Sequence, residues 1–226
     1  ILGNAAIADV PKVAVDIAPV HSLVSRVMEG VGSPKLIIPA GASPHEYSLR
    51  PSEAKSLQDA DMVIWMGEDL APWMENSIEK LAKNAEVITL LEASETKLLD
   101  FREGALFEEH DHGDHDDHDD HDDHDHDKDH DDHDDHDDHD DHAGHDHGEH
   151  DPHAWLSIEN AQTWLNLVAG KLSAADPENA GVYFGNAAAA RSEIEELSRE
   201  VNSILDPVRG RSFVVFHDAY QYFETS

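Results

Sequence analysis

The sequence predicts an α/β protein in which a parallel sheet is covered by helices on both faces. Over the first hundred residues, short runs rich in β-branched side chains alternate with amphipathic runs of helical period, and this alternation is typical of parallel sheets. After a central tract of His and Asp, a long run of helix formers leads into a further strand-like run near the C-terminus. With 226 residues, of which 39% are hydrophobic, the chain can bury a substantial core.

Seven elements are predicted ahead of the tract. Apolar, β-rich runs predict strands over residues 13–17, 35–38, 62–66 and 87–90. Amphipathic runs between them predict helices over residues 20–29, 51–60 and 72–83. Pro51 opens the second of these helices, at a position where its missing N–H costs nothing. We therefore expect residues 9–107 to form an N-terminal α/β lobe.

Two helices are predicted after the tract. Ser157 is a good N-cap for a helix that runs to Leu172, within a segment of residues 151–176. The next helix, within the segment 177–206, runs from Pro177 to about Leu205, which is about 29 residues and thus about 40 Å. Residues 207–226 contain "RSFVVFHDAYQYFETS", which predicts one strand and one short helix. Because these two elements cannot close a sheet, we expect them to begin a C-terminal α/β lobe that is mostly missing from this chain.

The start of the chain resembles the end of an export signal. The chain begins at Ile1 and contains Ala6, Ile7 and Ala8, small residues spaced like a signal-peptidase site. We interpret residues 1–8 as the remnant of such a signal; the alternative is an ordinary frayed terminus. Elsewhere no apolar run approaches the roughly 20 residues that a membrane span requires.

The charge of the chain is strongly negative and unevenly distributed. Of the formal −35, residues 110–150 contribute −20, from 21 acidic residues and one Lys, and the other 185 residues contribute −15. An acidic surface repels nucleic acid and anionic membranes, so a cationic partner such as a metal ion fits better. Because the chain has no cysteine, nitrogen and oxygen atoms must hold any metal.

The tract itself predicts a disordered His/Asp-rich loop over residues 108–150. Like charges repel one another there and apolar residues are almost absent. Neutral imidazoles bind Zn, Cu and Ni, but a flexible chain loses entropy when it wraps an ion, so we expect weak, exchangeable, auxiliary sites. The alternative is a solvating acidic linker whose histidines are incidental. The fifteen tract histidines are His110, His112, His115, His118, His121, His124, His126, His130, His133, His136, His139, His142, His145, His147 and His150.

Only four histidines lie outside the tract. His45, His153 and His217 each stand where a strand or loop leads into a helix, and His217 directly follows the apolar run "FVVF". Ligands of open α/β sheets bind beyond the carboxyl ends of the strands, so these three imidazoles could converge on one tetrahedral zinc ion. The alternative for each is an ordinary hydrogen-bonding role. We interpret His21, on a helix among apolar neighbours, as structural or as part of the rim of the site.

Four stretches of the chain carry a family resemblance. In chain order they are "IIPAGASPHEYSLRPSEAKSLQDADMVIWMGEDLAPWM", "HDPHAWLSIENAQ", "DPENAGVYFGNAAAA" and "FVVFHDAYQYF". Together with a charged His-rich loop ahead of the second, they resemble the periplasmic solute-binding proteins of zinc ABC importers, the ZnuA type. The resemblance covers residues 9–226. It implies two α/β lobes linked by one long helix, with the metal held between them, and therefore a truncated second lobe here.

The resemblance also implies a ligand set. Carried over by position, the ligands are His45, His153 and His217, and histidine at the third position resembles the zinc branch of the family rather than the manganese and iron branches. Imidazole is a softer ligand than carboxylate and favours Zn over Mn. Some zinc relatives have a carboxylate where this chain has Pro44, so the fourth ligand is open between Glu46, water and an acid of the C-terminal lobe.

The function implied by the resemblance is transport rather than catalysis. We expect a periplasmic monomer that captures Zn²⁺ and delivers it to the membrane permease of an ABC importer, without a nucleic-acid partner, while the tract collects or senses zinc. One alternative is a zinc storage or adhesion protein of the same fold. The other is a zinc hydrolase with Asp218 or Glu46 as general base, although no H-E-x-x-H helix is present.

Overall fold

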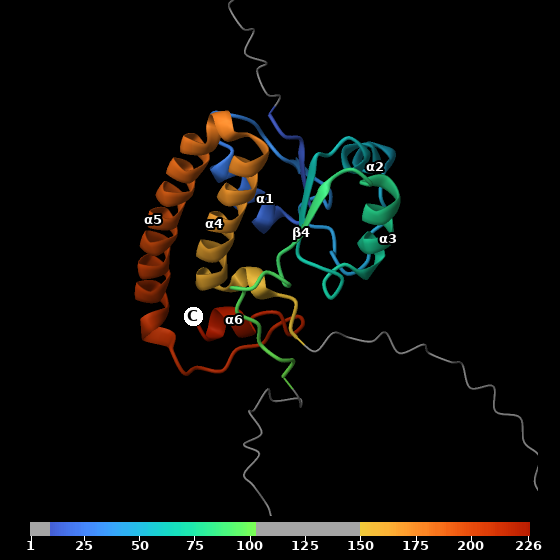
Figure 1. Cartoon of the computed structure of the whole chain (residues 1–226). Coiled ribbons are helices and arrows are strands. Elements are labelled where there is room, and N and C mark those ends of the chain that lie inside the picture. The colour runs from blue at the N-terminus through green and yellow to red at the C-terminus, as the bar shows by residue number, and fades with distance from the viewer. Residues whose placement is uncertain (1–9, 103–149) are drawn as a thin grey trace, which may run out of the picture. The chain divides into compact units, whose positions relative to one another are not determined.

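A four-stranded parallel sheet forms the centre of the protein in a computed structural model, which describes residues 10–102 and 150–226 (Figure 1). The strand order is β2-β1-β3-β4, and every neighbouring pair is parallel. The strands are β1 (Val13–Val15), β2 (Lys35–Leu36), β3 (Met62–Trp65) and β4 (Glu86–Thr89). All four predicted strands ahead of the tract are therefore confirmed: the first three are shorter than expected, and β4 keeps the expected length but begins one residue earlier.

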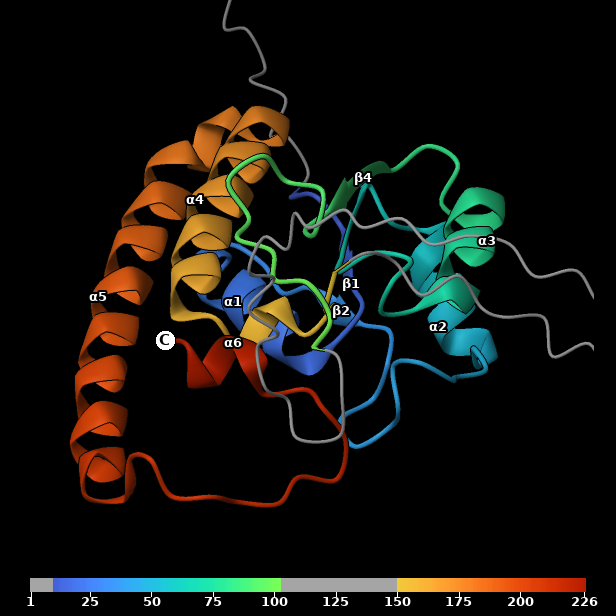
Figure 2. The same cartoon turned by 90° about the horizontal axis from the view of Figure 1, so that it is seen from below.

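Helices cover both faces of the sheet, as the sequence predicts. On one side lie α2 (Pro51–Gln58) and α3 (Pro72–Leu81), and on the other lie α1 (Ala18–Val27), α4 (Ile158–Ala175) and α5 (Ala180–Leu205) (Figures 1 and 2). The described residues also form three short 3₁₀ helices and one last turn of α-helix. They are η1 (Ala154–Leu156), η2 (Pro177–Asn179), η3 (Asp206–Val208) and α6 (Gln221–Glu224).

The core lies where the central strands meet the helices. All residues of β1 and β3 are buried, because both of their faces are covered, and this explains their unbroken apolar runs. Trp164 of α4 and Tyr183 of α5 are fully buried in the layer of helices. Among the described segments, no helix is long and apolar enough to cross a bilayer.

The two helices after the tract are present, with one difference. The Ser157 hydroxyl accepts a hydrogen bond from the Asn160 backbone N–H at 3.2 Å, which confirms the predicted N-cap of α4. The long helix begins with the 3₁₀ turn η2 before α5 continues for 26 residues. At this corner the buried Asp176 carboxylate accepts hydrogen bonds from the Asn179 side chain at 2.7 Å and from the Tyr183 hydroxyl at 2.8 Å.

The predicted strand over residues 213–216 is wrong for the structure described. The segment is extended but pairs with no strand of the described chain, and Val214 and Phe216 are almost fully exposed. An apolar, β-branched run becomes a strand only when a neighbour completes its hydrogen bonds and covers its side chains. The predicted short helix after it is confirmed as α6.

A buried carboxylate that the sequence did not reveal links two strands at the carboxyl edge of the sheet. Asp16 directly follows β1, and its side chain accepts hydrogen bonds from the Ile17 and Met66 backbone N–H groups, both at 2.7 Å. Met66 directly follows β3, so Asp16 joins the ends of adjacent strands. Burial raises the pKa of Asp16 to about 7, against the opposing effect of these two hydrogen bonds.

This raised pKa predicts a specific dependence of stability on pH. Because the folded pKa lies above the usual value of 3.8, the contribution of Asp16 to stability is greatest below pH 4 and is lost as the pH rises through 7. Between pH 5 and pH 8, the wild-type free energy of unfolding should fall by about 3 kcal/mol more than that of Asp16→Asn. Denaturant titration of both proteins at the two pH values measures this difference. Asp61→Asn, at an exposed carboxylate, is the control, and an equal change in wild type and Asp16→Asn would contradict the prediction.

Candidate metal centre

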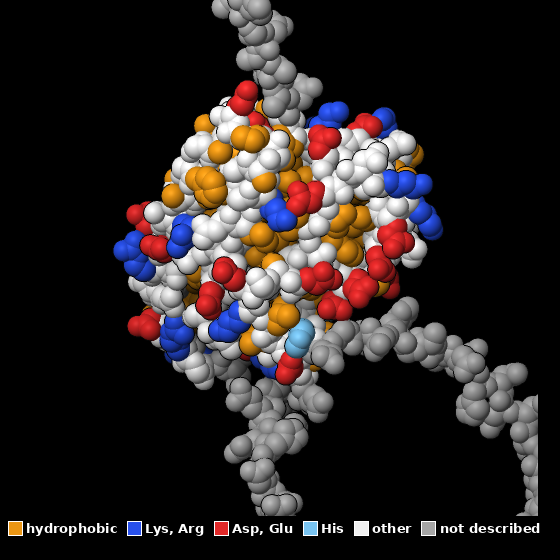
Figure 3. All heavy atoms as spheres, in the orientation of Figure 1, with side chains coloured by type: hydrophobic (Ala, Val, Ile, Leu, Met, Phe, Trp, Pro, Cys, Tyr) orange, Lys and Arg blue, Asp and Glu red, His pale blue; other side chains and the backbone are white. Residues whose placement is uncertain are grey.

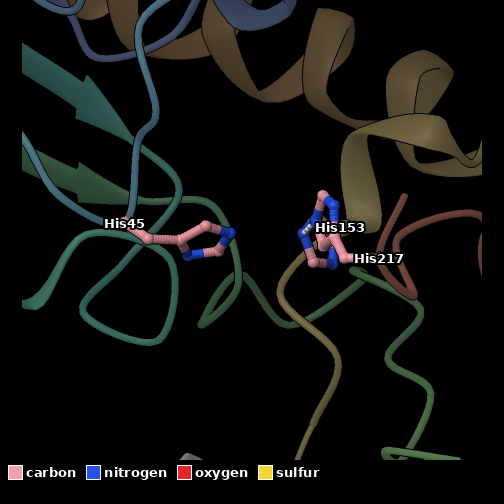
Figure 4. Close-up of side chains that lie close together, drawn as sticks. All are labelled: His45, His153 and His217. Atoms are coloured by element: carbon pink, nitrogen blue, oxygen red, sulfur yellow. Dashed lines mark hydrogen bonds between the residues drawn. The ribbon is translucent and has the colours of Figure 1, made fainter.

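Three histidines from distant parts of the chain meet at one place in the structure. His45 lies on the loop between β2 and α2, His153 directly precedes η1, and His217 lies between η3 and α6. One ring nitrogen of each lies within 4.8 Å of the others, and the ring centroids are 5.2 to 6.1 Å apart. Figure 4 shows His153 and His217 side by side, with the ring of His45 directed toward them.

The separation of the ring nitrogens fits tetrahedral metal coordination. The Nε2 atoms of His153 and His217 lie 3.3 Å apart. Zinc–nitrogen bonds of 2.0–2.1 Å at the tetrahedral angle place two ligand nitrogens about 3.3–3.4 Å apart. The two imidazoles therefore already have the spacing of two ligands of one metal ion. The ring nitrogen of His45 needs to approach by at most about 1.5 Å to complete a set of three ligands.

A buried carboxylate orients His153. The Asp151 Oδ1 atom lies 2.6 Å from His153 Nδ1 and also accepts the His153 backbone N–H at 2.9 Å. Both side chains are buried, with Asp151 2% and His153 5% exposed. Because Asp151 engages Nδ1, the Nε2 atom is left to face the centre, which is how carboxylates commonly orient metal-binding histidines.

The loop that carries His45 is held by aromatic side chains. The Trp73 indole N–H donates to the Pro44 carbonyl oxygen at 2.8 Å, directly before His45. The Tyr47 ring lies 5.8 Å from the Trp73 ring, and its hydroxyl donates to the Glu53 carboxylate at 2.9 Å. Partial burial of the His45 ring lowers its pKa, and His153 and His217 lower it further. A lowered pKa favours the neutral imidazole, the form that binds metals.

The Tyr222 side chain of α6 joins two backbone segments near the site: the one that contains Leu99 and the one that contains Asp151. Its buried hydroxyl donates to the Asp151 carbonyl oxygen and accepts the Leu99 backbone N–H, both at 2.9 Å. Burial of the ring raises the pKa of Tyr222 to about 12, and the charge of Asp151 contributes less to this rise. The hydroxyl therefore keeps its proton at neutral pH.

Sequence reasoning did not single out Asp151, Trp73 or Tyr222. Asp151 has a local signal, since it stands two residues before His153 in "DPH". Trp73 and Tyr222 act on residues 29 and 71 positions away, and such pairings have no signature in a single sequence.

The other proposed site residues lie elsewhere. Neither Glu46 nor Asp218 belongs to the group of close ligand atoms, which in the described chain holds only the three histidines. The ring of His21 lies within hydrogen-bonding distance of the Pro34 carbonyl oxygen, at 3.3 Å, and of the Ser25 hydroxyl, at 3.4 Å. This agrees with a structural role for His21.

Of the fifteen tract histidines, the structure describes only His150. Its Nδ1 atom lies 2.8 Å from the Asp100 carboxylate, and the two residues form an antiparallel bridge. The other fourteen, and residues 1–9 with the predicted signal remnant, lie outside the described residues.

The fold and the histidine cluster together are those of an α/β protein in which three imidazoles, placed where they could hold one metal ion, lie beside a parallel sheet. The family model of the periplasmic zinc-uptake complex component A, ZnuA, matches residues 13–226. The chain belongs to this family, as its sequence motifs predict.

Curated relatives agree with this assignment. The chain is 53% identical over 225 residues to the high-affinity zinc uptake system protein ZnuA of Paracoccus denitrificans, covering 98% of this chain and 66% of that protein. It is 48% identical over 212 residues to the protein of the same name from Brucella abortus, covering 94% of this chain and 63% of that one. The chain thus spans slightly less than two thirds of the length of these relatives.

Solved structures show the same fold. A ZnuA deletion mutant lacking residues 138–173, with zinc bound, superposes with a TM-score of 0.70 at 21% identity, covering 96% of this chain and 66% of that one. The Zn(II)-bound ZnuA-like domain of Streptococcus pneumoniae AdcA gives 0.64 at 22% identity, covering 95% and 63%.

The Asp151 contact predicts the tautomer of His153. In its neutral form, His153 should carry its proton on Nδ1, because the Asp151 carboxylate can only accept a hydrogen bond there. Nitrogen-15 NMR of the metal-free protein distinguishes the two ring nitrogens by their chemical shifts. Asp151→Asn should redistribute the tautomers, whereas a proton on Nε2 in the wild type would contradict the proposed orientation.

Proposed function

We propose that this chain captures Zn²⁺ in the periplasm through His45, His153 and His217 and delivers it to the membrane permease of an ABC importer. The observation that carries the proposal is the 3.3 Å separation of two Nε2 atoms with a third imidazole directed toward them. Membership of the zinc-uptake family supports the same cargo, compartment and partner.

The ligand chemistry favours zinc as the cargo. Three neutral imidazoles suit Zn²⁺, whereas Mn²⁺ and Mg²⁺ prefer oxygen ligands. Imidazole also suits Cu²⁺ and Ni²⁺, but they prefer square-planar or tetragonal arrangements to a tetrahedral one. The fourth position would be taken by water or a carboxylate. Glu46 is one candidate, because it adjoins His45 on the same loop, and an acid of a further lobe is the other.

We propose that the protein binds zinc without catalysing a reaction and that it acts as a monomer. A zinc hydrolase needs a general base beside the metal-bound water. The buried Asp151 carboxylate is committed to His153, and the ligand group of the described chain includes neither Glu46 nor Asp218. An acidic surface supports cation capture, and Figure 3 shows acidic side chains gathered near α3, on the right-hand side of the folded part.

We propose the tract as an auxiliary zinc collector or sensor. The limits of the lobes, the tract and the connecting helix are proposed as the sequence predicts them. The last histidine of the tract, His150, forms a bridge with Asp100 of the chain ahead of the tract, and His150 stands three residues before His153. Zinc held weakly along the tract would therefore be concentrated close to the three-histidine centre.

A zinc titration of four proteins tests both parts of the proposal. They are the chain as given, a form lacking residues 110–147 that keeps His150, and each of these with His153→Ala. Removing the tract should abolish most weak binding and leave one tight site, in which Mn²⁺ competes poorly. His153→Ala should weaken that site by more than about 100-fold, since loss of an outer partner alone costs about 10–100-fold.

The control is His21→Ala, which removes an imidazole with purely structural contacts and should leave the tight site unchanged. Loss of the tight site on tract deletion alone would show that the tract is the primary binding element. An unchanged affinity in His153→Ala would show that the three-histidine centre is not the binding site.

A further inference from the structure

We infer that the Tyr222 hydroxyl is a positioning group for the three-histidine centre, because it fastens the segment that carries His217 to the segment that carries His153. The inference rests on the proposed function, since it concerns the affinity of the same centre. Tyr222 is not a ligand and acts only through the segments that it joins.

The hydroxyl takes the place of a hydrogen bond between two backbone segments. Asp151 donates its backbone N–H to the Leu99 carbonyl oxygen at 2.8 Å, and Asp100 and His150 form the adjoining antiparallel bridge. The return bond, from the Leu99 N–H to the Asp151 carbonyl oxygen, is not made directly. Instead the Leu99 N–H donates to the Tyr222 hydroxyl, and that hydroxyl donates to the Asp151 carbonyl oxygen.

This relay acts on His153 through Asp151. The carbonyl oxygen of Asp151 is held by Tyr222, and its carboxylate holds both the backbone N–H and the ring Nδ1 of His153. The backbone position of Asp151 therefore sets the direction in which His153 Nε2 points. Asp151 and Tyr222 are both almost fully buried, so solvent cannot readily replace the missing bond.

The same side chain acts on His217 through the chain itself. Tyr222 lies five residues after His217, and α6, which carries it, packs against η1, which directly follows His153. Phe216 and His217 are exposed, so burial does not hold either side chain in place. The buried Tyr222 side chain thus anchors the chain five residues after His217, whose Nε2 atom lies 3.3 Å from that of His153.

Tyr222→Phe tests the inference, with Tyr183→Phe as a matched control. Both changes remove one hydroxyl from a fully buried ring, and Tyr183 donates to Asp176 at 2.8 Å. The Asp176 corner is separated from His153 by α4, whose 18 residues span about 27 Å. The two variants should lose similar thermal stability, so stability alone does not distinguish them.

Zinc affinity is measured on both variants and on wild type, all lacking residues 110–147. Tyr222→Phe should bind zinc about ten-fold more weakly than wild type, and Tyr183→Phe should bind as wild type does. Equal affinities in Tyr222→Phe and wild type would overturn the inference and leave the proposed function intact. Absence of tight zinc binding in the wild type itself would instead reject the proposed function.

A second measurement needs no variant and covers the case in which Tyr222→Phe does not fold. If zinc draws the segments of His153 and His217 together, the hydrogen bond from the Leu99 N–H to the Tyr222 hydroxyl should open less often. The Leu99 amide should then exchange with solvent more slowly when one equivalent of zinc is bound. The Asn179 amide, at the Asp176 corner, should be unaffected. Unchanged exchange at Leu99 would overturn the inference.

Discussion

All four strands of the sheet run in the same direction, and this direction determines how the chain can connect them. It requires helical connections, so both faces of the sheet are covered and the central strands are buried throughout. It also brings the carboxyl ends of the strands to one edge. There the Asp16 carboxylate joins the ends of β1 and β3, and the loop after β2 leads to His45. One arm of the candidate centre is thus fixed by the sheet itself.

The other two arms depend on long-range hydrogen bonds rather than on strands. His153 is oriented by the buried Asp151, and the backbone of Asp151 is hydrogen-bonded to Leu99 and to the Tyr222 hydroxyl. His217 reaches the centre because the helix that follows it is anchored at the same point. The proposed site is therefore made of described residues alone, and its geometry does not depend on the tract.

The sequence predicted most of the fold because helical and strand periods are local properties. All four strands of the sheet, the Ser157 cap and the long helix were visible in this way. Residues 213–216 have the same local signature but form no strand among the described residues, since pairing depends on a neighbour. The three histidines of the candidate centre stood out because they are isolated and lie at junctions, whereas Asp16, Trp73 and Tyr222 were missed because tertiary contacts alone give them their roles.

We propose that three imidazoles of the folded chain, not the tract, form the specific zinc site. The most direct measurement is zinc-edge X-ray absorption on the form lacking residues 110–147, loaded with one equivalent of Zn²⁺. We predict a four-coordinate spectrum with three imidazole nitrogens at about 2.0–2.1 Å and one further nitrogen or oxygen atom. A spectrum with one imidazole or none, or a shell made mainly of oxygen atoms, would contradict the account.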